Sequence, residues 1–136
     1  MTGAIPDSLG QLKNLKICTA FGNRLSGIVP PLIFNISSIT AFDVGVNELH
    51  GRLPVGIGTT LPNLQFFSVG YNQFTGSIPL TICNLSSAEL LQFSVSQFSG
   101  NVPFVGNLKH LLSFRFSADN LGSRGLKDDL ISLLFD

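Results

Sequence analysis

The sequence predicts an α/β solenoid, in which coils of about 24 residues stack and their short strands form a concave parallel sheet. Three residue types recur in one register: prolines after an apolar residue, glycines three positions before them, and small polar residues four positions before the glycines. The prolines are Pro6, Pro30, Pro54, Pro79 and Pro103; the glycines are Gly3, Gly27, Gly51, Gly76 and Gly100; the small polar residues, called ladder residues below, are Asn23, Asn47, Asn72, Ser96 and Asp119. Repeats of this period are typical of solenoids.

The composition agrees with this fold and excludes several function classes. The 136 residues carry no net charge, and only 12 % are charged, against about 25 % in typical soluble domains. So few cations argue against nucleic-acid binding, and 44 % hydrophobic residues argue against disorder. The mean hydropathy is +0.39, yet no run of about 18 apolar residues could span a membrane. Rows of core residues in every coil account for the apolar character.

Each coil begins with apolar residues at four fixed offsets before its ladder residue. The last two of these alternate with exposed positions, which is typical of a short strand with one buried face. The four residues are Leu12, Leu15, Cys18 and Ala20 in coil one; Ile36, Ile39, Phe42 and Val44 in coil two; Leu61, Leu64, Phe67 and Val69 in coil three; Leu85, Ala88, Leu91 and Phe93 in coil four; and Leu108, Leu111, Phe114 and Phe116 in coil five. One array over residues 1–136 is expected, with a partial coil 1–11 and coils starting near 12, 36, 61, 85 and 108.

The ladder residues are expected to satisfy backbone groups where the chain turns after each strand. An Asn amide both donates and accepts, so it can bond to the backbone of adjoining coils. Ser96 and Asp119 replace Asn in coils four and five. Ser satisfies fewer partners and an ionised Asp cannot donate, so the last two coils are expected to be looser. The ladder glycines allow a positive φ, and the ladder prolines fix φ on the side wall.

The repeat resembles the plant-type leucine-rich repeat, L-x-x-L-x-x-L-x-L-x-x-N-x-L-x-G-x-I-P-x-x-L, from Thr2 to about Leu121. Its Gly-x-apolar-Pro element, as in Gly76-Ser-Ile-Pro79, is specific to that class. The resemblance implies a right-handed superhelix with short 3-10 or irregular convex segments and a second, side-wall strand. It is closest in kind to the extracellular domains of plant leucine-rich-repeat receptor-like serine/threonine kinases of the immune-receptor subfamily.

The two ends suggest an internal piece of a longer array. Met1 falls within a repeat, and the capping module that carries a cysteine pair in this family is not present. Apolar residues at helical offsets predict a short helix at about 126–135. The N-terminus lacks the basic start and apolar core of a secretory signal.

No constellation for catalysis, metal binding or a cofactor is expected. His50 and His110 fall at exposed positions of different coils, and every glycine is explained by the repeat rather than by a phosphate-binding loop. Cys18 and Cys83 are about three coils apart, which is too far for a disulfide, so both are expected as free thiols. The chain is therefore not predicted to be an enzyme; a full-length relative would carry a separate kinase domain.

A binding surface is instead expected on the concave face, where strand residues alternate with the core rows. The candidate ligand-binding residues are Phe21, Asp43, Val46, Phe66, Ser68, Tyr71, Leu90, Gln92 and Arg115. Several of them, together with Ile17, would form an apolar stripe, and such patches often mark partner sites. The expected partner is a peptide or protein ligand, with a co-receptor ectodomain as a further candidate, and not nucleic acid.

Two Asn-x-Ser sequons occupy the same repeat position, at Asn35 and Asn84. They predict N-glycosylation of an extracellular solenoid, if the chain belongs to a secreted parent. The resemblance thus implies a ligand-perception module for defence signalling, on the extracellular face of the plasma membrane. Two alternatives remain open at this point: a secreted repeat-type inhibitor of a cell-wall-degrading enzyme, and a truncated reading frame without function.

Overall fold

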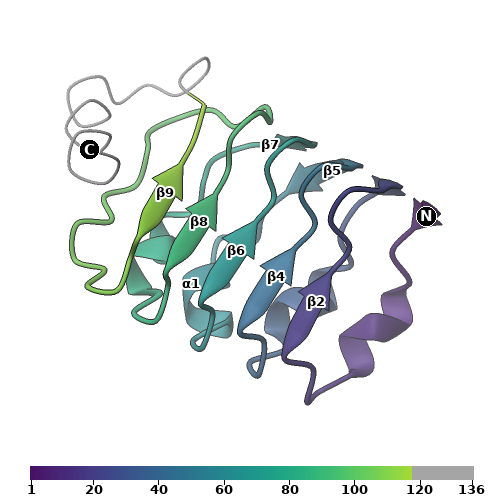
Figure 1. Cartoon of the computed structure of the whole chain (residues 1–136), viewed down its shortest axis with the longest axis horizontal. Helices are drawn as coiled ribbons and strands as arrows, with labels where there is room; N and C mark the ends of the chain where they lie inside the picture. The colour runs from purple at the N-terminus through teal and green to yellow at the C-terminus, as the bar shows by residue number, and fades with distance from the viewer. Residues whose placement is uncertain (118–136) are drawn as a thin grey trace.

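Two parallel sheets run side by side along the solenoid in the computed structural model, which describes residues 1–117 (Figure 1). The concave sheet has the order β2-β4-β6-β8-β9, and the side-wall sheet has the order β1-β3-β5-β7. The concave strands are β2 (Ile17–Thr19), β4 (Ala41–Asp43), β6 (Phe66–Ser68), β8 (Leu90–Gln92) and β9 (Ser113–Arg115); the side-wall strands are β1 (Thr2–Ala4), β3 (Arg24–Gly27), β5 (Glu48–Arg52) and β7 (Gln73–Thr75). The predicted solenoid and its second strand are confirmed.

Short helices cover the side of the molecule opposite the concave sheet (Figure 1). Three are 3-10 helices, η1 (Asp7–Gln11), η2 (Pro31–Asn35) and η3 (Leu80–Asn84), and each begins directly after a ladder proline. Coil two differs: it has one residue more than coils one and three between its ladder proline and the start of the next coil, and this stretch forms the single α-turn α1 (Ile57–Thr60). No helix within residues 1–117 has the length and apolarity to cross a membrane.

Phenylalanine rings from successive coils pack against one another in a row through the core. The ring centroids of Phe42 and Phe67 are 5.4 Å apart, those of Phe67 and Phe93 are 5.7 Å apart, and those of Phe93 and Phe114 are 6.1 Å apart. All four rings are essentially inaccessible to water. Each aromatic pair adds about 0.5–1.5 kcal/mol beyond its burial, so the interfaces between coils, rather than single coils, hold the array together.

Coil one is less buried than the repeat predicts. Leu12 is 48 % exposed, and Leu15, Cys18 and Ala20 are only half-buried, although their positions are core positions in the other coils. The reason is that β2 is the edge of the concave sheet within the described chain, so these side chains are packed from one side only.

The side wall depends on glycine at the end of each of its strands. Gly51 has a φ of 102°, and a Cβ built there would lie 3.1 Å from a methyl group of Ile28 in the preceding coil. A larger residue would therefore meet both an unfavourable backbone conformation and a close neighbour. These glycines let consecutive side-wall strands approach closely enough to pair.

Candidate ligand-binding face

Two rows of side chains point outward from the concave sheet, because the strands pair in register from coil to coil. The apolar row contains Ile17, Ala41, Phe66, Leu90 and Ser113, and the polar row contains Thr19, Asp43, Ser68, Gln92 and Arg115. The residue between each pair is part of the core. The period-two alternation of the sequence thus becomes two parallel rows that cross all five strands.

The apolar row is accessible to a partner. Ile17 is 63 % exposed and Phe66 is 44 % exposed, while Leu90 is half-buried between its neighbours. Parallel strands lie about 4.8 Å apart, so these side chains form a continuous surface rather than isolated contacts. A patch of this kind is an interaction surface more often than scattered single residues are.

The polar row is partly held in place by the backbone. One carboxylate oxygen of Asp43 accepts a hydrogen bond from the Gly45 amide at 2.9 Å, and the Gln92 side-chain oxygen accepts one from the Ser94 amide, also at 2.9 Å. Arg115 is exposed, and its one side-chain hydrogen bond within residues 1–117 goes from Nε to the Ser113 hydroxyl at 3.4 Å. Because these side chains are already oriented, they lose less conformational entropy when a ligand binds.

Beyond the polar row, the surface is formed by the backbone at the buried glycines Gly45 and Gly70, and we call this part the floor. A Cβ at Gly70 would approach the carbonyl oxygen of Ser94 to 2.8 Å, and one at Gly45 would lie 3.0 Å from the Ser68 hydroxyl. Side chains are therefore excluded at these two positions, which leaves the surface low between the rows on either side.

A third row borders this floor and has an unusual backbone. Val46, Tyr71 and Val95 directly precede successive ladder residues, have φ values of 58°, 58° and 54°, and are 41–53 % exposed. We call these three residues the left-handed ridge. Positive φ is rare for valine, and such a conformation costs about 1–3 kcal/mol. Bonds between coils impose it: the Val46 amide donates to the Gly70 carbonyl at 3.0 Å, and the Tyr71 amide donates to that of Ser94 at 2.9 Å.

Phe21 lies beside this ridge in coil one. It is 59 % exposed and precedes Gly22, which has a φ of 73° at the position that the ridge residues occupy in later coils. The concave face therefore brings together all nine candidate ligand-binding residues as neighbouring rows. The sequence does not reveal the backbone of the ridge, since valine gives no indication of a left-handed conformation.

The asparagine ladder underlies this face. Asn72 donates from Nδ2 to the carbonyls of Val44, Val69 and Gly70 at 2.9–3.2 Å, and its Oδ1 accepts from the Leu49 amide at 2.9 Å. Asn47 forms the same set of bonds one coil earlier, and Asn23 also bonds to nearby carbonyls. By contrast, the Ser96 hydroxyl is buried with no partner within residues 1–117. Asp119 and the helix expected at 126–135 lie outside the described residues.

The two sequon asparagines lie away from the concave face. Asn35 and Asn84 are exposed at the last positions of η2 and η3, on the convex side. Both cysteines are free thiols, and burial raises the pKa of Cys18. The histidines of the described chain are exposed, and residues 1–117 contain no group of three or more potential metal ligands.

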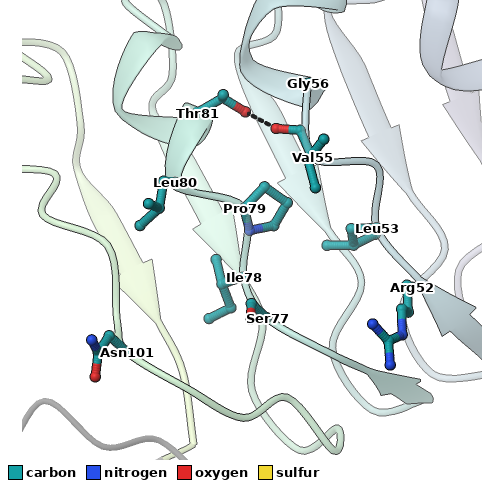
Figure 2. A pocket seen from close by; sticks show the side chains of 10 residues that line it. All are labelled: Arg52, Leu53, Val55, Gly56, Ser77, Ile78, Pro79, Leu80, Thr81 and Asn101. Carbon is teal, nitrogen blue, oxygen red and sulfur yellow. Dashed lines mark hydrogen bonds between the residues drawn. The ribbon is translucent and has the colours of Figure 1, made fainter.

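A separate groove of about 610 Å³ opens on the side wall between coils two and three, with Asn101 of coil four at its edge (Figure 2). Its lining consists of Arg52, Leu53, Val55, Gly56, Ser77, Ile78, Pro79, Leu80, Thr81 and Asn101. The Thr81 hydroxyl donates to the Val55 carbonyl at 2.6 Å across its upper end. The repeat pattern did not indicate this groove. The feature of the sequence that could have indicated it is an apolar residue directly after the ladder proline, as at Val55 and Leu80, which are 84 % and 70 % exposed.

Comparison with known proteins identifies the repeat. Residues 63–85 match the family model described as Leucine Rich Repeat. Phytosulfokine receptor 1 of Arabidopsis thaliana is 33 % identical over 102 residues, which cover 74 % of this chain and 10 % of that receptor. Receptor-like protein 32 of the same plant is 36 % identical over 112 residues, covering 81 % of this chain and 13 % of the relative.

Among solved structures, the leucine-rich-repeat ectodomain of the Arabidopsis receptor kinase HAESA, in complex with an N-terminally extended IDA peptide hormone ligand, matches with a TM-score of 0.80. The identity is 29 %, and the match covers 85 % of this chain and 20 % of that one. The chain thus spans about a tenth of the length of the curated relatives it matches.

Proposed function

The chain is a plant-type leucine-rich-repeat array that resembles the ectodomains of plant receptor kinases, and from this premise we propose that its concave face binds a peptide or protein ligand. The observation that carries the proposal is the arrangement of that face. An exposed apolar row and the exposed left-handed ridge lie on either side of a polar row and a floor of backbone. Such a surface offers apolar contacts on both sides and hydrogen-bonding groups between them.

An extended polypeptide fits this surface better than a charged polymer does. The polar row has a single acidic and a single basic side chain, so it lacks the dense charge that a nucleic acid or an acidic polysaccharide requires. Aromatic side chains such as Phe66 and Tyr71 are the residue types that dominate the energetics of protein interfaces. The solved HAESA complex, in which a related ectodomain holds a peptide hormone, supports the same choice.

The finer biological setting is part of the proposal. We place the face outside the cell, in a receptor that perceives its ligand for defence signalling and pairs with a co-receptor ectodomain. N-linked glycans at Asn35 and Asn84 would then lie on the convex side and leave the concave face uncovered. The proposal concerns binding alone and assigns this chain no catalytic step.

The direct test is alanine substitution on the face, with binding to a displayed library of random peptides as the assay. Peptides selected on the full chain should bind Phe66→Ala and Tyr71→Ala about tenfold or more weakly, because exposed aromatic anchors contribute upward of about 1 kcal/mol each. Leu80→Ala is the matched control, since this exposed apolar side chain lies on the side wall. Unchanged affinity at both aromatic sites, or no selectable peptide at all, would overturn the proposal.

A further inference from the structure

The concave face carries one acidic and one basic side chain in the same row, at Asp43 and Arg115. We infer that the ligand is an extended peptide lying across the strands, with a basic side chain over Asp43, an acidic side chain over Arg115, and mainly apolar residues between them. The inference rests on the proposed function and specifies its ligand class.

The spacing of the two charges sets the length of this peptide segment. Asp43 pairs with Ser68, Ser68 with Gln92, and Gln92 with Arg115, so the two charged residues are three strand spacings apart. At about 4.8 Å for each spacing, the separation is about 14 Å. An extended chain covers about 3.3–3.6 Å per residue, so the basic and acidic side chains should be about four residues apart.

Neither charge has an ion-pair partner among residues 1–117. Within that part of the chain, Arg115 has only the long contact to the Ser113 hydroxyl. The Gly45 amide occupies one oxygen of Asp43 and fixes the carboxylate, which leaves the other oxygen to accept from a cation. Ser68 and Gln92, between the two charges, are uncharged and favour no third charge in the ligand.

The flanking rows explain why the intervening residues should be apolar. Phe66 and Leu90 border the polar row on one side, and the left-handed ridge borders it on the other. Val46 and Val95 are exposed while holding a disfavoured backbone, so their side chains add little packing within the chain to offset that cost. Contact with an apolar side chain of the ligand would bury these exposed valine side chains.

The test uses the full chain and a random peptide library displayed inside a longer polypeptide, so that peptide ends carry no charge. Peptides selected on the unchanged chain should share a basic and an acidic residue about four positions apart, in one order, with apolar residues between them. Asp43→Asn, which keeps the oxygen that accepts from Gly45, should weaken their binding about three- to tenfold, and Arg115→Gln should do the same.

Reversing the charge at Arg115 tests directly whether this residue pairs with the acidic side chain of the peptide. Selection on Arg115→Glu should replace the acidic residue by a basic one at the same position of the peptide and leave the other charge unchanged. Lys16→Gln and Glu89→Gln are matched controls, because each removes a charge just before a concave strand but outside the polar row.

The outcomes separate this inference from the proposed function. If peptides bind through Phe66 and Tyr71 but show no charge order, or if only the two control substitutions change that order, the dipolar ligand is wrong and the binding face stands. If no peptide is selected on the full chain, the proposed function fails, and this inference fails with it.

Discussion

The ladder position shows how much one side chain can matter in a repeat. Asn47 and Asn72 each connect three carbonyls and one amide across two coils, whereas the buried Ser96 hydroxyl has no partner among residues 1–117. Each hydrogen bond contributes about 0.5–1.5 kcal/mol net, and an unpaired buried group costs about 1–3 kcal/mol. The identity of the ladder residue therefore indicates, from sequence alone, which coils have a complete set of ladder hydrogen bonds, because the repeat register marks where an amide is needed.

Ser96→Asn should raise the free energy of unfolding by about 1 kcal/mol, since the amide would reach the same kind of backbone groups that Asn72 reaches one coil earlier. Urea denaturation of the full chain measures the change. Ser96→Ala is the control and should be close to neutral, because the hydroxyl it removes forms no bond in the part of the chain that the structure describes. A destabilised Asn variant together with a strongly destabilised Ala variant would show that Ser96 has a partner after all.

The contact between α1 and η3 illustrates an element-scale feature that sequence patterns did not indicate. The Gly58 amide donates to the Thr81 hydroxyl at 3.1 Å, and that hydroxyl donates to the Val55 carbonyl. A Cβ at Gly58 would collide with the Thr81 carbonyl oxygen, so glycine allows the two elements to touch. The additional residue of coil two lies in the stretch that forms α1, and the repeat pattern alone does not specify the conformation of an inserted residue.

Thr81→Val should lower the free energy of unfolding by about 1–3 kcal/mol, because it removes both bonds and leaves the Gly58 amide, which belongs to a buried residue, without its acceptor. Thermal or chemical denaturation measures the loss. Thr81→Ser retains the hydroxyl and should stay within about 0.5 kcal/mol of the unchanged chain. Equal losses for the two variants would assign the effect to packing of the methyl group instead.

At the scale of the whole molecule, the periodic parts of the fold were predictable and the exceptions were not. The rows around Phe42, Phe67 and Phe93 follow from a 24-residue repeat, because stacked coils must bury equivalent positions. Val46 and Tyr71 were assigned to the concave face, but their left-handed backbone arises from bonds to the next coil, which no local preference of valine or tyrosine reveals. Similarly, the partial exposure of Leu12 depends on the sheet edge and not on the repeat.

Hydrogen exchange on the full chain should reveal an uneven array. The amide of Phe42, in β4, should be the most protected, because β4 is paired on each side and Asn72 completes its coil. Coils three and four, around Phe67 and Leu91, should open at a lower free energy because Ser96 forms no ladder bond within residues 1–117. Coil one should also exchange faster, since β2 is an edge strand. Uniform protection across β2 to β8 would contradict this prediction.

The ladder bonds have a direction, and this has a consequence for how the chain acquires its structure. Asn47 reaches back to Ala20 and Leu25, and Asn72 reaches back to Val44 and Leu49, so each coil is completed by a side chain from the coil that follows it. During synthesis, a coil that has left the ribosome lacks these bonds until about 24 more residues have emerged. Folding then trails synthesis by one repeat. The seam after coil three, where Ser96 replaces Asn, is closed by the core, by strand pairing and by backbone bonds such as the one from the Tyr71 amide to the Ser94 carbonyl.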